Sequence, residues 1–145
     1  RVDSETGEIT MVTDALVRPN GLAFSPDEQF LYVSDTGASH VKGHPPLIRV
    51  FEVVDGRTLR GGGEFATCTN GFFDGFRLDT EGRIWTSAGD GVHVYDPDGT
   101  LLGKVLIPEV VANVEFGGPK RNRLFICGTT SLYSVLLPVN GVKKL

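Results

Sequence analysis

Two polar residues, Asn20 and Asp74, stand at matching places in two repeats of the sequence, where each precedes a glycine and an apolar run. If both runs are the innermost strands of neighbouring units, an amide oxygen and a carboxylate converge at one opening. Such oxygens are ligands of a hard cation such as Ca²⁺, whereas Zn²⁺ more often binds His or Cys, which neither position offers. Asn-Gly and Asp-Gly are also common turn dipeptides. Spacing alone therefore favours a turn and leaves metal binding as the alternative.

The repeat has three copies, each composed of a strand-like run, a polar turn and a second strand-like run. The first runs begin at Asn20, Asp74 and Ala112, which lie 54 and 38 residues apart. Since the third copy has Ala112 at the matching position, it should contribute no ligand. Repeats of about 40 to 50 residues with several strands each are typical of a β-propeller.

Further alternating and β-branched segments predict the remaining strands. They are Ile9–Thr13, Leu47–Val53, Gly63–Thr67, Gly91–Tyr95, Leu101–Ile107 and Ser131–Leu137. No window has the apolar periodicity of a helix. The sequence therefore predicts an all-β propeller of about three four-stranded blades, at residues 18–68, 69–108 and 109–145, after the end of a preceding blade at 1–17. Because propellers have about four to eight blades, we expect the chain to form one part of a larger ring.

Composition excludes several classes of function. The chain has 40% hydrophobic and 22% charged residues, as in ordinary soluble globular proteins. Its 14 basic and 18 acidic residues give a net charge of −4, so a nucleic-acid partner is not expected. No run of about 18 apolar residues predicts a membrane span, and no signal peptide is visible. The compartment is not assigned.

The cysteines and the glycine run do not indicate a function. Two cysteines do not make a disulfide framework, and whether Cys68 and Cys127 are paired is open. Cys127 lies in an apolar run and is expected to be buried. The run Gly61–Gly63 is not followed by a helical pattern, which disfavours a phosphate-binding loop.

Other polar residues have simpler interpretations as structural groups. Asn113, one position past the third repeat start, could line the same opening, although packing or capping is favoured. His40 and His44 lie in a loop that could overhang the opening, and solvation is the simpler expectation. His93 alternates with valines within a strand, which predicts a structural role, and Asp35 next to Gly37 predicts a turn cap.

Three groups of segments resemble the senescence marker protein/gluconolactonase/luciferin-regenerating enzyme family. They are Arg18–Asp27 with Leu31–Asp35, then Asp74–Trp85, and finally Phe116–Pro119 with Arg123–Ile126 and Thr130–Tyr133. The resemblance runs from about Pro19 to Val135. Phe73 departs from the family pattern, which usually has Pro before the aspartate.

The resemblance implies the C-terminal half of a six-bladed propeller with one divalent metal in its channel. Asn20 and Asp74 match metal ligands of the family, and Asp74 also matches its general base or nucleophile. Ca²⁺ is preferred over Zn²⁺, Mn²⁺ or Mg²⁺. The family's metal-binding Glu belongs to its first blade, which no part of this sequence matches. No substrate-binding residue is assigned.

The implied function is metal-dependent hydrolysis of sugar lactones, with the metal polarising the lactone carbonyl and Asp74 as the catalytic residue. The partner is thus a small-molecule lactone or ester, and the other half of the propeller is required in the same chain or by assembly. Two alternatives stay open: a non-catalytic propeller that binds a ligand, and a hydrolase of other esters or organophosphates in the same site.

Overall fold

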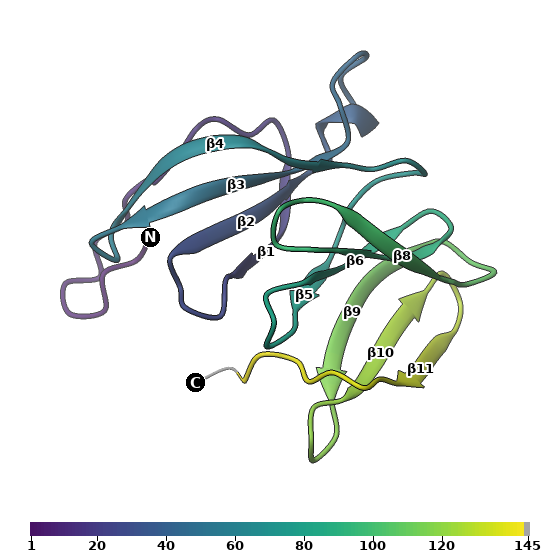
Figure 1. Ribbon diagram of the computed structural model, residues 1–145. Helices are drawn as coiled ribbons and strands as arrows, with labels where there is room; N and C mark the ends of the chain where they lie inside the picture. The colour runs from purple at the N-terminus through teal and green to yellow at the C-terminus, as the bar shows by residue number, and fades with distance from the viewer. Residues whose placement is uncertain (144–145) are drawn as a thin grey trace.

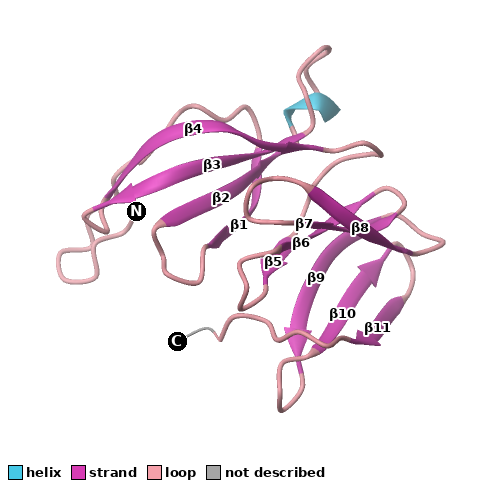
Figure 2. Cartoon of the chain, in the orientation of Figure 1, coloured by secondary structure: helices cyan, strands magenta, loops and turns pink. Residues whose placement is uncertain are grey.

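Three antiparallel sheets make up the structure, a computed structural model that describes residues 1–143. Figures 1 and 2 show the sheets side by side, each following the one before it in the chain. The first sheet contains β1 (Pro19–Phe24), β2 (Phe30–Asp35), β3 (Leu47–Val54) and β4 (Thr58–Thr67). The second contains β5 (Phe76–Leu78), β6 (Ile84–Ala88), β7 (Gly91–Tyr95) and β8 (Leu101–Leu106). The third contains β9 (Val111–Gly117), β10 (Arg123–Gly128) and β11 (Leu132–Leu136).

In each sheet, strands that are consecutive in the chain lie next to each other. β1, β5 and β9 are therefore the first strands of their respective sheets, and each lies at an edge. These three first strands also contact one another in order, β1 with β5 and β5 with β9. Sheets that meet along their innermost strands are blades of a propeller, as the sequence predicts. The only helix among the described residues is a single 3₁₀ turn, Gly37–Ser39. The described part of the chain has no helix long and apolar enough to cross a membrane.

Two apolar cores lie between the blades. The first joins Tyr32 and Ile48 of the first blade to Phe76 and Ile84 of the second. A second core lies between the second and third blades, where the Trp85 ring meets the Phe116 ring edge-on with centroids 5.9 Å apart. Because the second blade is covered on both faces, every residue of β6 and β7 is buried. Their sequences accordingly contain few charged side chains.

A buried aspartate fixes the turn between β5 and β6. The Asp79 carboxylate accepts hydrogen bonds from the Glu81 and Arg83 backbone N–H groups, each 3.0 Å long. It also accepts from Arg83 Nε at 2.8 Å and from Trp85 Nε1 at 2.9 Å. Four donors compensate the loss of hydration, so a fully buried charge is tolerated here.

The structure corrects one predicted outer strand. Residues 9–13 form no strand, and Ile9 makes only an isolated bridge with Val2, across the turn between them. The third blade has three strands within residues 1–143. Lys144 and Leu145, at the end of the predicted last blade, lie outside the described residues. The division of the chain at residues 68 and 108 stays a prediction.

The predicted burial of Cys127 is wrong, and the glycine run lies in a strand. Cys127 is exposed and Cys68 is buried, and both are free thiols. Cys127 alternates with the buried Ile126, so its side chain points to the open face of β10. The run at 61–63 lies inside β4, where Gly61 and Gly62 have φ of +89° and +93° at a bulge. A Cβ on Gly62 would lie 2.6 Å from the Phe51 ring, which explains a glycine inside a strand.

Candidate functional site

Backbone hydrogen bonds align the first residues of the three innermost strands. Gly21 N–H donates to the Asp74 carbonyl at 3.1 Å, and Gly75 N–H donates to the Ala112 carbonyl at 2.9 Å. The same contact therefore joins the first blade to the second and the second to the third. Asn20, Asp74 and Ala112 occupy equivalent positions at one end of the innermost strands.

Two serines reinforce this alignment. Ser34 Oγ donates to the Asp74 carbonyl at 2.8 Å and lies 3.2 Å from the Gly21 carbonyl. Ser87 Oγ accepts the Asp74 backbone N–H at 2.9 Å. Both serines are fully buried, so these bonds form away from water. The Asp74 backbone is thus held by Ser34 of β2 in the first blade and by Ser87 of β6 in its own blade.

The glycines after Asn20 and Asp74 allow the blades to approach each other. A Cβ on Gly21 would lie 2.2 Å from the Asp74 carbonyl oxygen, and one on Gly75 would lie 2.1 Å from Asn113 Oδ1. Asn20 itself lies within β1. Close approach of the next blade, by its backbone at Gly21 and by the Asn113 side chain at Gly75, explains glycine at these positions better than the turn that the dipeptide suggests.

Asn20 and Asp74 meet through their side chains. Burial raises the pKa of the half-buried Asp74 carboxyl, and a hydrogen bond from the Asn20 side chain offsets part of this rise. A cleft of about 490 Å³ opens above the pair. Its lining is contributed by loops and strand starts of all three blades: Asn20, Thr36, Ser39, Asn70, Gly71, Phe72, Asp74, Gly89, Val110, Val111 and Ala112.

The donor chemistry of this pair fits part of a cation site. A carboxylate and an amide oxygen suit Ca²⁺ or Mg²⁺, and a desolvated carboxylate with one amide partner retains capacity for a cation. Ca²⁺ takes about six to eight oxygens. Among residues 1–143 no group of three or more His, Cys, Asp or Glu side chains could hold a metal. The pair is therefore compatible with a metal but supplies only some of its ligands.

Asn113 and His93 take structural roles. Asn113 Oδ1 accepts the Val114 backbone N–H at 2.8 Å, and the side chain packs on Gly75. His93 is fully buried, with Nε2 2.6 Å from Asp90 Oδ1. A hydrogen bond from Lys104, followed by that of His93, lowers the pKa of Asp90.

Asp35 caps the loop after β2, as the sequence indicates. Its carboxylate accepts the backbone N–H groups of Val17, Arg18 and Gly37, each at 2.9 Å. Burial raises the pKa of Asp35, but these three donors and the neighbouring His44 outweigh burial and keep the pKa below its usual value. His40 Nδ1 lies 2.7 Å from Ser39 Oγ. The loop reaches the cleft through Ser39 and Thr36 rather than through its histidines.

Most residues that line the cleft were not predicted from the sequence. Asn70 and Phe72 come from the loop after β4, and Val110 precedes β9. Phe72 is 41% exposed, whereas the adjacent Phe73 is 1% exposed and anchors the loop in the core. Gly89 N–H and Cys68 Sγ both donate to the Asn70 carbonyl, at 2.9 Å and 3.1 Å. An exposed aromatic on a fixed loop beside Asp74 becomes evident only in three dimensions.

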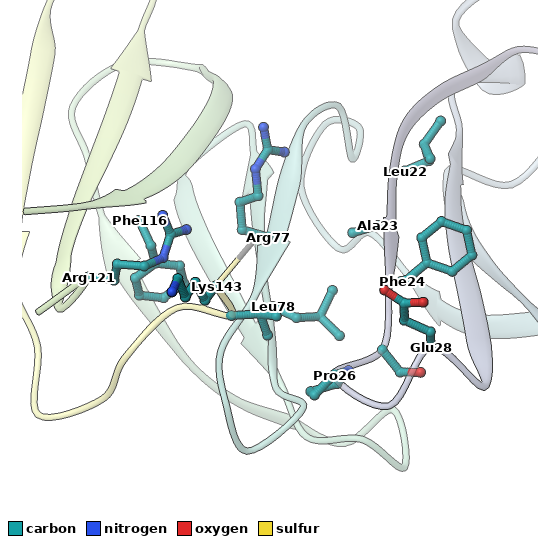
Figure 3. Close-up of a pocket in the computed structure, with 12 residues that line it drawn as sticks. Leu22, Ala23, Phe24, Pro26, Glu28, Arg77, Leu78, Phe116, Arg121 and Lys143 are labelled. Carbon is teal, nitrogen blue, oxygen red and sulfur yellow. The ribbon is translucent and has the colours of Figure 1, made fainter. Parts of the chain in front are cut away.

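A second, larger cleft of about 620 Å³ lies at the opposite end of the innermost strands. Figure 3 shows Phe24 and Glu28 on one side of it and Arg77 and Arg121 on the other. The Arg77 guanidinium is paired with Glu115 at 2.7 Å. The cleft contains neither Asn20 nor Asp74, so its size alone does not make it the reactive site.

Comparisons with known proteins match the chain to one family and to several relatives. Residues 1–130 match the family model described as the SMP-30/Gluconolactonase/LRE-like region. The lactonohydrolase oryH of Aspergillus oryzae is 32% identical over 159 residues, which cover 97% of this chain and 34% of that protein. The 6-deoxy-6-sulfogluconolactonase of Pseudomonas putida is 37% identical over 129 residues, 87% of this chain and 43% of that protein.

A solved structure of a gluconolactonase from Xanthomonas campestris superposes with a TM-score of 0.83 at 40% identity. The superposition covers 94% of this chain and 43% of that one. The chain thus spans less than half the length of these relatives, and all three are named for the hydrolysis of lactones.

Proposed function

The chain belongs to the SMP-30/gluconolactonase/LRE-like family, and from this premise we propose that it forms part of a hydrolase that opens sugar lactones. The observation that carries the proposal is the contact of Asn20 with Asp74 at the base of a cleft that a small sugar ring could enter. The names of the relatives supply the substrate class.

Asn20 and Asp74 would hold the divalent cation of the site, for which we propose Ca²⁺. When bound, the cation polarises the lactone carbonyl and stabilises the oxyanion that forms on it. Two oxygens from this chain leave room for ligands from elsewhere and for substrate. The Asn20 side chain lies beside the Asp74 carboxyl and lowers its pKa, against the effect of burial.

Asp74 acts as the general base. Its carboxylate accepts a proton from water as the water oxygen adds to the lactone carbonyl; the ring C–O bond then breaks, and the same proton passes from Asp74 to the leaving ring oxygen to give the hydroxy acid. Ser34 donates a hydrogen bond to the Asp74 carbonyl and Ser87 accepts one from the Asp74 backbone N–H, and together they fix the backbone that carries the carboxylate. Positioning matters because a carboxylate beside a cation stays ionised and is a weak base.

A pH-stat assay of glucono-lactone opening with added calcium, corrected for the spontaneous reaction, tests this proposal. We expect Asp74→Ala to lower kcat/KM by at least about 100-fold, the usual contribution of a general base. Asp98→Ala is the matched control, since Asp98 lies in the turn between β7 and β8, away from the cleft. Equal rates for wild type and Asp74→Ala would overturn the proposal.

The second candidate is a propeller that binds a ligand without catalysis. It is favoured by the absence, among residues 1–143, of any group of three or more His, Cys, Asp or Glu side chains that could hold a metal ion. Calcium binding that depends on Asp74, without any acceleration of lactone opening, would select this alternative.

A further inference from the structure

The loop between β4 and β5 places an aromatic ring in the same cleft as Asp74. Phe72 and Asp74 both line the cleft, and Phe72 is 41% exposed. Phe73, which lies between them, is 1% exposed, and its ring packs edge-on against the Tyr95 ring with centroids 5.7 Å apart. An aromatic side chain that stays in water forgoes the free energy that its burial would contribute. A ligand in the cleft can therefore gain that free energy by covering the Phe72 ring.

The backbone of this loop is fixed by hydrogen bonds to both sides. The Asn70 carbonyl accepts the Gly89 backbone N–H at 2.9 Å and the Cys68 thiol at 3.1 Å. Lys104 Nζ of the second blade lies 3.4 Å from Thr69 Oγ1 and donates to it. A loop that is already ordered presents its side chains at little further cost of conformational entropy when a ligand binds.

The side chain of Asn70 keeps its hydrogen-bonding capacity in the cleft. Both loop bonds use the Asn70 carbonyl of the backbone, and the side-chain amide forms no hydrogen bond with any residue in 1–143. The amide lies over Gly89, where a Cβ would be 2.6 Å from Asn70 Oδ1. An asparagine amide offers two N–H donors and a carbonyl acceptor in one plane. Asn70 therefore presents donors and an acceptor together beside the Phe72 ring.

Other hydroxyl groups that line the cleft already donate to the backbone. Ser39 Oγ donates to the Thr36 carbonyl at 2.7 Å, and Thr36 Oγ1 donates to the Arg18 carbonyl at 3.2 Å. Each hydroxyl has a single proton to donate. Asn70 is thus better placed than these two residues to donate hydrogen bonds to a ligand.

These two side chains match the two kinds of surface on a sugar lactone ring. Hydroxyl groups surround the edge of such a ring, and C–H groups form its faces. An aromatic ring packs on the apolar C–H face, whereas a planar amide can donate to one hydroxyl and accept from the next. A few polar groups in a partly apolar pocket fix the orientation of a small ligand in this way.

We propose that Phe72 and Asn70 are specificity-determining residues, which select a lactone ring that carries adjacent hydroxyls; this inference rests on the proposed lactone hydrolysis. Phe72 packs on the C–H face of the ring, Asn70 binds two neighbouring hydroxyls, and Asp74 serves the carbonyl. A ring without hydroxyls retains the contact with Phe72 and loses the bonds to Asn70.

Two ring amides separate recognition from catalysis. Gluconolactam carries the sugar hydroxyls, δ-valerolactam has none, and NMR titration with calcium present measures the binding of each. We expect Phe72→Ala to weaken gluconolactam binding by about 10-fold through the lost apolar contact, and Phe72→Tyr to stay within about twofold of wild type. Phe30→Ala is the matched control, since Phe30 of β2 is 42% exposed and does not line the cleft.

Asn70→Ala separates the two contacts. It should weaken gluconolactam binding by about fivefold, as for lost hydrogen bonds, and leave δ-valerolactam binding unchanged. Equal gluconolactam affinity in wild type and Phe72→Ala would overturn the inference, as would no gluconolactam binding by folded wild type, or an equal loss of both lactams in Asn70→Ala. Gluconolactam binding that depends on Phe72 and Asn70, without hydrolysis of the lactone, would support the inference and reject the proposed catalysis.

Discussion

Gly21 controls how closely the first two blades meet at the candidate site. In Gly21→Ala the new methyl would lie 2.2 Å from the Asp74 carbonyl oxygen and 3.1 Å from Gly75 Cα. Both are backbone atoms, so no side-chain rotation can relieve the overlap. Forced overpacking costs about 1–3 kcal/mol. Separation of the strands also weakens the Gly21 N–H bond to Asp74, which contributes about 1 kcal/mol. We expect a loss of about 2–4 kcal/mol in unfolding free energy.

Urea unfolding followed by tryptophan fluorescence measures this loss, since Trp85 lies next to the second core. Gly103→Ala is the matched control: Gly103 lies in β8, and nothing is within 4 Å of its Cβ position. Alanine there should be neutral or stabilise by up to about 1 kcal/mol. Equal stability of the two variants would refute the close approach of the blades at Asn20 and Asp74.

Three further predictions concern other parts of the chain. Hydrogen bonds from Ser131, Thr130 and Tyr133 lower the pKa of Glu109 from 4.5 to about 2, so the stability they give is complete above pH 4.5 and is lost as the pH falls towards 2. Glu109→Gln should therefore flatten the acid dependence of unfolding in this range, and parallel profiles would contradict the assignment. Asp35→Asn should lower the free energy of unfolding by about 2–4 kcal/mol, because one amide oxygen cannot accept three backbone N–H groups. Thermal or urea unfolding measures this loss, and a value below about 1 kcal/mol would argue against the cap. With a thiol reagent, Cys127 should react in the folded chain and Cys68 only after unfolding, and equal reaction rates would exclude the burial of Cys68.

The strands are largely encoded in local sequence. β7 has the bounds of its predicted segment, Gly91–Tyr95, and β3 extends one residue beyond the predicted Leu47–Val53. Prediction fails where a strand depends on a partner or on an exception to local rules. Residues 9–13 have strand character without a sheet to join, and glycines in β4 take positive φ at a bulge. The hydrophobic periodicity of the sequence predicts neither the missing sheet partner of residues 9–13 nor the positive φ of the β4 glycines.

For the candidate site too, the sequence predicts some residues and not others. Repetition of the pattern places Asn20 and Asp74 at equivalent positions, and the structure brings their side chains together. Phe72 and Ser39 lie in loops of different blades, and their approach to the cleft depends on packing that no local pattern records. The roles of Asn20 and Asp74 as metal ligands stay predictions, as does catalysis by Asp74.

Calcium titration by calorimetry of wild type, Asn20→Ala, Asp74→Ala and the double variant tests the shared metal site most directly. If both side chains bind one cation, each single substitution should remove most of the affinity and the double variant should lose little more. We predict this non-additive result, with the calcium affinity of Asp98→Ala unchanged. Absence of calcium binding by folded wild type, or single losses that simply add, would contradict it.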